Sequence, residues 1–123
     1  TFEHIDASRV LFDTESFFVI EDGFPVSPGH CLIISKSLNE TFFDLSDSEK
    51  HELIDAVQLA KQWIESRHSP DGYNIGINCG QAAGQTVMQF HCHVIPRYTG
   101  DVKDARGGIR HCVHGKGFYE PHE

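Results

Sequence analysis

A chain of 123 residues suits one domain with a single hydrophobic core, and we expect residues 1–123 to form it. The formal net charge of −8 argues against general nucleic-acid binding, which needs many Lys and Arg side chains to neutralise phosphates. The sequence has neither an apolar run of about 18 residues nor a charged and then apolar leader, so we expect a cytoplasmic protein without membrane contact.

The first third of the chain predicts three strands. Apolar runs at residues 10–12 and 17–20 are separated by a polar stretch, a pattern typical of a hairpin. A turn-rich segment, residues 21–29, then leads into residues 30–35, which are almost continuously apolar. This third run predicts a strand that is buried on both faces.

A helix should begin at Ser46, because Ser46 and Glu49 have the spacing of a capping box. We expect Pro70-Asp71-Gly72 to end it. Five apolar residues recur at helical spacing and should pack on a sheet: Leu53, Ile54, Val57, Ala60 and Ile64.

Residues 73–78 read as a further strand, and residues 87–95 as the last one, closed by Pro96. Side chains alternate across a strand. One face of the last strand should therefore carry Gln89, His91 and His93, and the other face Met88, Phe90, Cys92 and Val94. The loop between the two strands contains small residues and short polar side chains, which let backbone N–H groups approach an anion. Together these features indicate a phosphate held against a nucleophile or base.

The motif Gly84-Gln85-Thr86-Val87, followed by Gln89-x-His91-x-His93-Val94-Ile95-Pro96-Arg97, resembles the histidine triad (HIT) family of nucleotide hydrolases and transferases. The likeness is to its fragile-histidine-triad, diadenosine polyphosphate hydrolase branch. It continues upstream to Pro25-x-x-Pro28-Gly29-His30 and covers roughly residues 10–110. The resemblance implies an α+β fold, in which one main helix packs on an antiparallel sheet of about five strands. It also implies a homodimer with a continuous sheet.

The resemblance implies catalytic roles for four residues. His91 matches the family's nucleophile, His93 would hydrogen-bond the phosphoryl oxygens and assist the leaving group, and His30 would support them from behind. Gln89 stands where the family has its first histidine. A glutamine can replace the hydrogen bonds of a neutral imidazole but cannot titrate near neutral pH.

Nucleotide binding is implied for five further residues. Ile20 would lie in the base pocket, Asp22 would contact a ribose hydroxyl, and the reacting phosphate would be bound by Asn78, Gln85 and Thr86. In isolation, Asp22 and Asn78 have a simpler interpretation as turn-forming residues.

The expected substrate is a nucleotide, attacked at its α-phosphate in a phosphoanhydride or P–N bond through a nucleotidyl-histidine intermediate. The chemistry requires no cofactor and no protein-bound metal, and leaves room for a divalent cation on the substrate phosphates. The basic residues after the histidine strand, such as Arg97, Arg106 and Arg110, could meet a polyphosphate tail or belong to a solvated tail.

Two alternatives stay open at this point. A nucleotide-binding sensor would keep the pocket but have lost turnover through Gln89. A zinc-dependent hydrolase or metal-binding module would use His91-Cys92-His93 or His111-Cys112-Val113-His114. In a regular strand, however, Cys92 points away from its flanking histidines.

Overall fold

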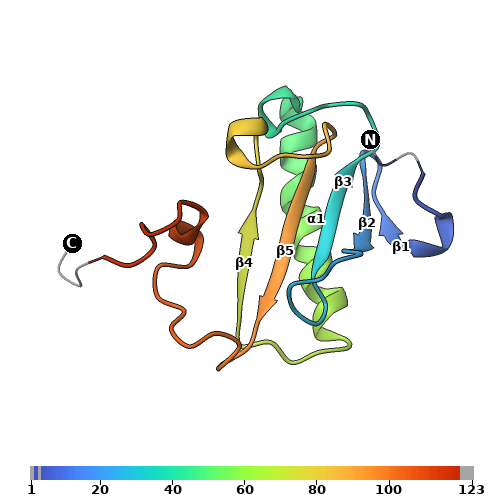
Figure 1. The fold of residues 1–123 in the computed structure, drawn as a ribbon. Coiled ribbons are helices and arrows are strands. Elements are labelled where there is room, and N and C mark those ends of the chain that lie inside the picture. The colour runs from blue at the N-terminus through green and yellow to red at the C-terminus, as the bar shows by residue number, and fades with distance from the viewer. Residues whose placement is uncertain (1, 3, 120–123) are drawn as a thin grey trace.

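The predicted apolar runs form five strands of one antiparallel sheet. A computed structural model describes residue 2 and residues 4–119 (Figure 1). The strand order in the sheet is β1-β2-β3-β5-β4, and every neighbouring pair is antiparallel. This confirms the α+β fold, a five-stranded sheet with one main helix. The strands are β1 (Val10–Asp13), β2 (Phe17–Glu21), β3 (Cys31–Ser35), β4 (Gly72–Gly76) and β5 (His91–Arg97).

Helix α1 (Asp47–Glu65) begins where the capping box predicted. The Glu49 N–H donates to Ser46 Oγ at 3.1 Å, and the Ser46 N–H donates to Glu49 Oε1 at 2.9 Å. The helix ends at Glu65, before the predicted stop, and the Ser66 hydroxyl donates to the Trp63 carbonyl at 2.6 Å beyond that end. The prediction for Ile54 was wrong, because this side chain is 68% exposed. The buried stripe of the helix is Leu53, Ala56, Ala60 and Ile64.

Apolar side chains gather on both faces of the sheet. The larger cluster lies between α1 and the sheet and contains, among others, Phe17, Ile33, Phe90, Cys92 and Val94. A smaller cluster on the opposite face joins Ile20, Leu32 and Ile34 to Phe2 and Ile5 of the N-terminal segment. Because β3 contributes to both clusters, all five of its residues are buried, as its continuous apolar sequence predicted.

Strand β5 differs from its prediction at both ends. It begins at His91 rather than at Val87, and Met88 is 43% exposed instead of lying in the core. Pro96 lies inside the strand rather than closing it. The proline is tolerated because the β3 ladder reaches only Val94, so Pro96 pairs with β4 alone.

The C-terminal segment leaves β5 and runs beside β4, away from β1 (Figure 1). It contains a short 3₁₀ helix, η4 (Gly108–Cys112), that contacts β4. Among residues 2 and 4–119, no helix has the length and apolar character needed to span a bilayer.

Candidate active site

Strand β5 places two imidazoles side by side on the face of the sheet opposite α1. The rings of His91 and His93 are 5.5 Å apart, whereas Cys92 between them is buried on the helix side. Both imidazoles line a pocket of about 460 Å³. Its lining includes Phe2, Ile5, Ile20, Asp22, Leu32, Asn78, Gly84, Thr86, His91 and His93.

The orientation of His91 follows from one hydrogen bond. Its Nδ1 lies 2.8 Å from the backbone carbonyl of Gln89. A carbonyl only accepts, so Nδ1 carries the hydrogen and donates it. In the neutral ring the lone pair then resides on Nε2. The Phe2 ring meets this imidazole edge-on, with centroids 5.1 Å apart.

His93 has the opposite tautomer, set by a chain of two hydrogen bonds. The Val26 N–H donates to His30 Nδ1 at 3.2 Å, so neutral His30 carries its hydrogen on Nε2. His30 Nε2 in turn lies 2.9 Å from His93 Nδ1 and donates to it. The hydrogen of neutral His93 is therefore on Nε2. The two β5 imidazoles therefore differ at Nε2. His91 Nε2 has a lone pair, whereas His93 Nε2 carries a hydrogen.

Burial keeps this pair of histidines neutral. His30 is 2% exposed, and desolvation lowers its pKa. The negative charge of Asp22 acts in the opposite direction but is the smaller effect. Desolvation is also the main cause of the lowered pKa of His93, and the nearby His30 and His91 act in the same direction. Both rings are thus mainly uncharged at pH 7, which preserves the hydrogen-bond chain.

Asp22 lies beside this chain. Its Oδ2 is 3.4 Å from His30 Nε2 and 3.9 Å from His93 Nδ1, and its Oδ1 accepts the Phe24 N–H at 2.8 Å. Asp22, His30 and His93 are the group of described residues that could hold a metal ion, with ligand atoms within 4.8 Å of one another. Two nitrogen ligands of a tetrahedral zinc ion are about 3.3 Å apart. His30 Nε2 and His93 Nδ1 are only 2.9 Å apart, a distance that fits a hydrogen bond better than two ligands of one metal ion.

The other zinc ligands considered from the sequence lie apart from this group. Burial raises the pKa of the Cys92 thiol to about 12, which disfavours the thiolate that zinc requires. Within residues 4–119, His111, Cys112 and His114 do not assemble into a cluster with metal-ligand spacing.

The loop before β5 presents Asn78 and Thr86 to the pocket, and both side chains are exposed. Gly80 and Gly84 have φ of 90° and 96°, a region that favours glycine, and they bracket the 3₁₀ helix η3 (Gln81–Ala83). Gln85 is 3% exposed and turns inward. Its oxygen accepts the Gly80 N–H at 2.7 Å, and its nitrogen donates to the carbonyls of Glu40 and Val87 at 2.7 and 3.1 Å.

Gln89 also turns away from the pocket. It is 5% exposed, and its side chain bonds to the backbones of Phe2 and Ser35. The structure thus brings Ile20, Asp22, Asn78, Thr86, His91 and His93 into one pocket. His30 lies behind His93, and both glutamines are buried in the frame around the pocket.

Sequence reasoning missed the N-terminal side of the pocket. Phe2 and Ile5 line it, although residues 1–9 showed no strong pattern. The available signal was two large apolar residues in a short polar stretch, which is weak because isolated apolar residues are common on protein surfaces. Leu32 was predicted as a strand residue but not as a lining residue.

Comparisons with known proteins give consistent matches. A family model of the HIT domain matches residues 4–100. The bis(5′-nucleosyl)-tetraphosphatase (asymmetrical) of Schizosaccharomyces pombe is 36% identical over 97 residues, 79% of this chain and 53% of that protein. The nitrilase and fragile histidine triad fusion protein NitFhit of Caenorhabditis elegans is 32% identical over 101 residues, 82% of this chain and 23% of that protein.

The fold comparison gives the same result. The crystal structure of a hypothetical histidine triad nucleotide-binding protein from Sulfolobus tokodaii superposes with a TM-score of 0.71 at 33% identity, covering 78% of this chain and 64% of that one. The chain spans only about half of the yeast relative and about a quarter of the nematode relative. From the matched residues and the shared fold, the chain belongs to the HIT domain family.

Proposed function

We propose that the protein is a nucleotide hydrolase or nucleotidyl transferase that acts at the α-phosphate of dinucleoside polyphosphates or nucleoside phosphoramidates. The observation that carries this proposal is the complementary pair of tautomers on β5. A lone pair on His91 Nε2 supplies a nucleophile, and a proton on His93 Nε2 supplies a hydrogen-bond donor for the phosphoryl group. The names of two relatives, a bis(5′-nucleosyl)-tetraphosphatase and a bis(5′-adenosyl)-triphosphatase, support this substrate class.

The reaction divides into two displacements. His91 Nε2 attacks the α-phosphorus, an N–P bond forms, and the P–O bond to the leaving phosphate breaks. A polyphosphate leaves as an anion and needs no proton, whereas the amine of a phosphoramidate takes up a proton from solvent as its P–N bond breaks. His93 Nε2–H donates a hydrogen bond to a phosphoryl oxygen throughout. Water then attacks phosphorus, and the N–P bond breaks with its electron pair returning to His91. One proton of that water stays on the released nucleoside monophosphate, and the other passes to solvent.

The surrounding residues have supporting roles in this proposal. Ile20 and Leu32 would offer an apolar surface for a base, and Asp22, which lines the same pocket, would accept from ribose hydroxyls. Asn78 and Thr86 would hold the reacting phosphate. Gln85 fixes the loop that carries them rather than contacting phosphate itself. The chemistry requires no cofactor, and a divalent cation would enter only on the substrate phosphates.

Rapid-quench mass spectrometry of the intact protein tests the proposal. With diadenosine tetraphosphate, the wild type should acquire an adenylyl adduct, and His91→Ala should lose both the adduct and turnover by about three orders of magnitude or more. His51→Ala, which changes an exposed histidine of α1, is the matched control. Equal turnover in wild type and His91→Ala would contradict the proposal. Tight nucleotide binding with neither adduct nor product would identify a sensor instead.

A homodimer is the second part of the proposal. Strand β4 forms one edge of the sheet, and its Ile75 is 49% exposed, so a second copy could extend the sheet there. Sedimentation velocity at several protein concentrations measures the association. A monomer at all concentrations would contradict the dimer and leave the chemistry at His91 unaffected.

A further inference from the structure

A second groove opens from the pocket of His91 and His93 and extends across the sheet towards the C-terminal segment. Its volume is about 790 Å³. It shares three lining residues, Asn78, Gly84 and His93, with the catalytic pocket. The two depressions therefore meet at the proposed position of the reacting phosphate, and one ligand could occupy both.

The floor of the groove is the open face of β5 and β4. Gly76 pairs with His93, and Asn74 pairs with Ile95, so these residues share the face of the catalytic imidazoles. Gly76 has no side chain to raise the floor, and a Cβ added there would already lie 3.8 Å from Ile109 Cδ1. The path from His93 towards η4 is thus unobstructed by β4.

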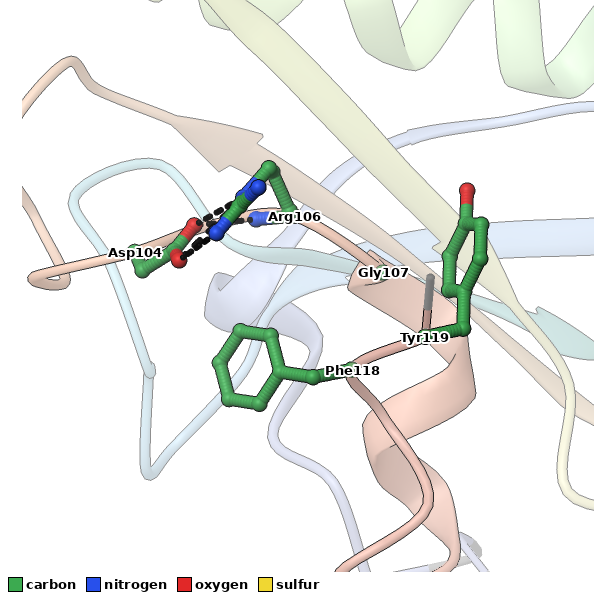
Figure 2. Close-up of a pocket in the computed structure, with 5 residues that line it drawn as sticks. All are labelled: Asp104, Arg106, Gly107, Phe118 and Tyr119. Atoms are coloured by element: carbon green, nitrogen blue, oxygen red, sulfur yellow. Dashed lines mark hydrogen bonds and ion pairs between the residues drawn. The ribbon is translucent and has the colours of Figure 1, made fainter. Parts of the chain in front are cut away.

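The far wall is a folded structure, residues 104–119. The Arg110 guanidinium donates to the carbonyls of Lys116 and Gly117 at 3.1 and 3.3 Å and lies 4.6 Å from the Tyr119 ring centroid. His111 packs so closely on Gly117 that any side chain there would collide with its ring. Figure 2 shows Arg106 turned towards Asp104, while Phe118 and Tyr119 point in different directions from the same turn of chain.

The groove is mainly aliphatic where it leaves the catalytic pocket. Val26, Ile109 and Val113 line it and are 71%, 58% and 57% exposed, which is unusual for side chains gathered around one depression. Ile95 lies between them on the floor. Such walls suit a flat uncharged ring better than a phosphate chain.

The nearby arginines are engaged within the protein. Arg97 makes two 2.8 Å hydrogen bonds to Asp101, and Arg106 pairs with Asp104. Arg97 Nη1 also donates to Asn74 Oδ1 at 2.6 Å, which fixes that carboxamide with its nitrogen towards Gly108. Asn74 lines the groove and thus adds an amide of fixed orientation to its aliphatic part.

We propose that this groove binds the second nucleoside of a dinucleoside polyphosphate, the half that departs with the leaving phosphate. Its base lies among Val26, Ile95, Ile109 and Val113, and the amide of Asn74 faces its polar edge. The first nucleoside occupies the pocket of Ile20 and Asp22. This assignment rests on the proposed function and adds to it a recognition site for the leaving group.

Two substrates, one with and one without a second nucleoside, test the assignment: diadenosine tetraphosphate and adenosine 5′-tetraphosphate. The wild type should have a kcat/KM about tenfold higher for the dinucleotide, the size expected from burying one base. Ile109→Gln should reduce the ratio of the two kcat/KM values to about one. Ile54→Gln, at a similarly exposed isoleucine of α1, should leave both values unchanged.

Three results would overturn the assignment. Equal kcat/KM of the wild type for the two substrates would show that the second nucleoside is not recognised, although hydrolysis itself would uphold the proposed function. An unchanged substrate preference in Ile109→Gln would exclude this groove. A loss of both activities together with a lower sedimentation coefficient would show that a second copy of the chain covers the groove. Hydrolysis of neither substrate by the wild type would instead refute the proposed function.

Discussion

The side-chain oxygen of Gln89 accepts the backbone N–H of Phe2 at 2.7 Å, across 87 positions of sequence. Its amide nitrogen donates to the Ser35 carbonyl at 2.6 Å. One buried amide thus connects the N-terminal segment, the end of β3 and the segment just before β5. Because both ends of the amide bond to backbone, Gln89 serves as an anchor for Phe2, whose ring lies against His91.

Gln89→Ala should therefore destabilise the protein and widen the nucleotide pocket. The variant leaves the Ser35 carbonyl and the Phe2 N–H without this partner, at a cost of about 1–3 kcal/mol each if they stay buried. Urea unfolding should show the lower free energy, and KM should rise more than kcat falls. Gln58→Ala, at an exposed position of α1, is the control. A Gln89→Ala protein as stable as wild type would disprove the anchoring role.

The loop of Asn78 and Thr86 should depend on Gln85 in a similar way. Gln85→Ala removes three hydrogen bonds to backbone, including the one that closes the loop on Gly80, and we expect a loss of about 1–3 kcal/mol in unfolding free energy. Gln81→Ala, on the exposed side of the same loop, should change stability by less than about 0.5 kcal/mol. Substrate KM should rise only in the first variant. If the two variants behave alike, the buried amide does not organise the loop.

Stability should decrease on the acid side of neutrality because of the buried histidines. Burial lowers the pKa of both His30 and His93 in the folded protein. Between the ordinary value of about 6.5 and these lower values the unfolded chain binds more protons, so unfolding becomes easier as the pH falls through this range. Above about pH 7 both states are neutral at these groups, and their contribution becomes constant.

Urea unfolding between about pH 8 and pH 5 measures this dependence. His30→Gln removes one of the two groups and should flatten the slope below pH 6.5 relative to wild type. His51→Gln, at an exposed position, should retain the wild-type slope. An identical slope in all three proteins would show that the buried pair does not control acid stability.

The start of α1 offers a test that is independent of the site. Ser46→Ala removes the side-chain half of the capping box and should lower the unfolding free energy by about 1 kcal/mol. Ser48→Ala, two positions later in the same helix and also exposed, should have little effect or a slightly stabilising one, because alanine favours helix. Circular dichroism during thermal unfolding measures both. Equal melting temperatures of Ser46→Ala and wild type would contradict the importance of the cap.

The order of apolar and polar residues along the chain predicted strands and helices well where the buried side chains follow one regular spacing. Alternation correctly separated His91 and His93 from Phe90, Cys92 and Val94, because pairing with β3 from His91 to Val94 keeps this part of the chain regularly extended. The helix pattern was less selective. Leu53 and Ile54 are adjacent, about 100° apart around the helix, and the contact with the sheet is too narrow to bury both.

The inward turn of Gln85 and Gln89 could not be predicted, because their partners are distant in sequence. Gln85 reaches Glu40, and Gln89 reaches Ser35 and Phe2. A glutamine before a strand has the same local pattern whether it faces a phosphate or a buried carbonyl. The position of Phe2 against His91 depends on that same long-range bond and was hidden for the same reason.

The two walls beside β5 come from opposite parts of the chain, the segment around Phe2 and residues 104–119. Because of this separation, the ribosome synthesises the first wall well before the second. A nascent chain exposed as far as Arg97 already contains every strand, helix α1 and both β5 histidines, and it can complete the core between the sheet and α1. The groove that we assign to the leaving nucleoside still lacks its outer side. On this assignment, the growing chain has its complete core before it has the site proposed to distinguish one-base from two-base substrates.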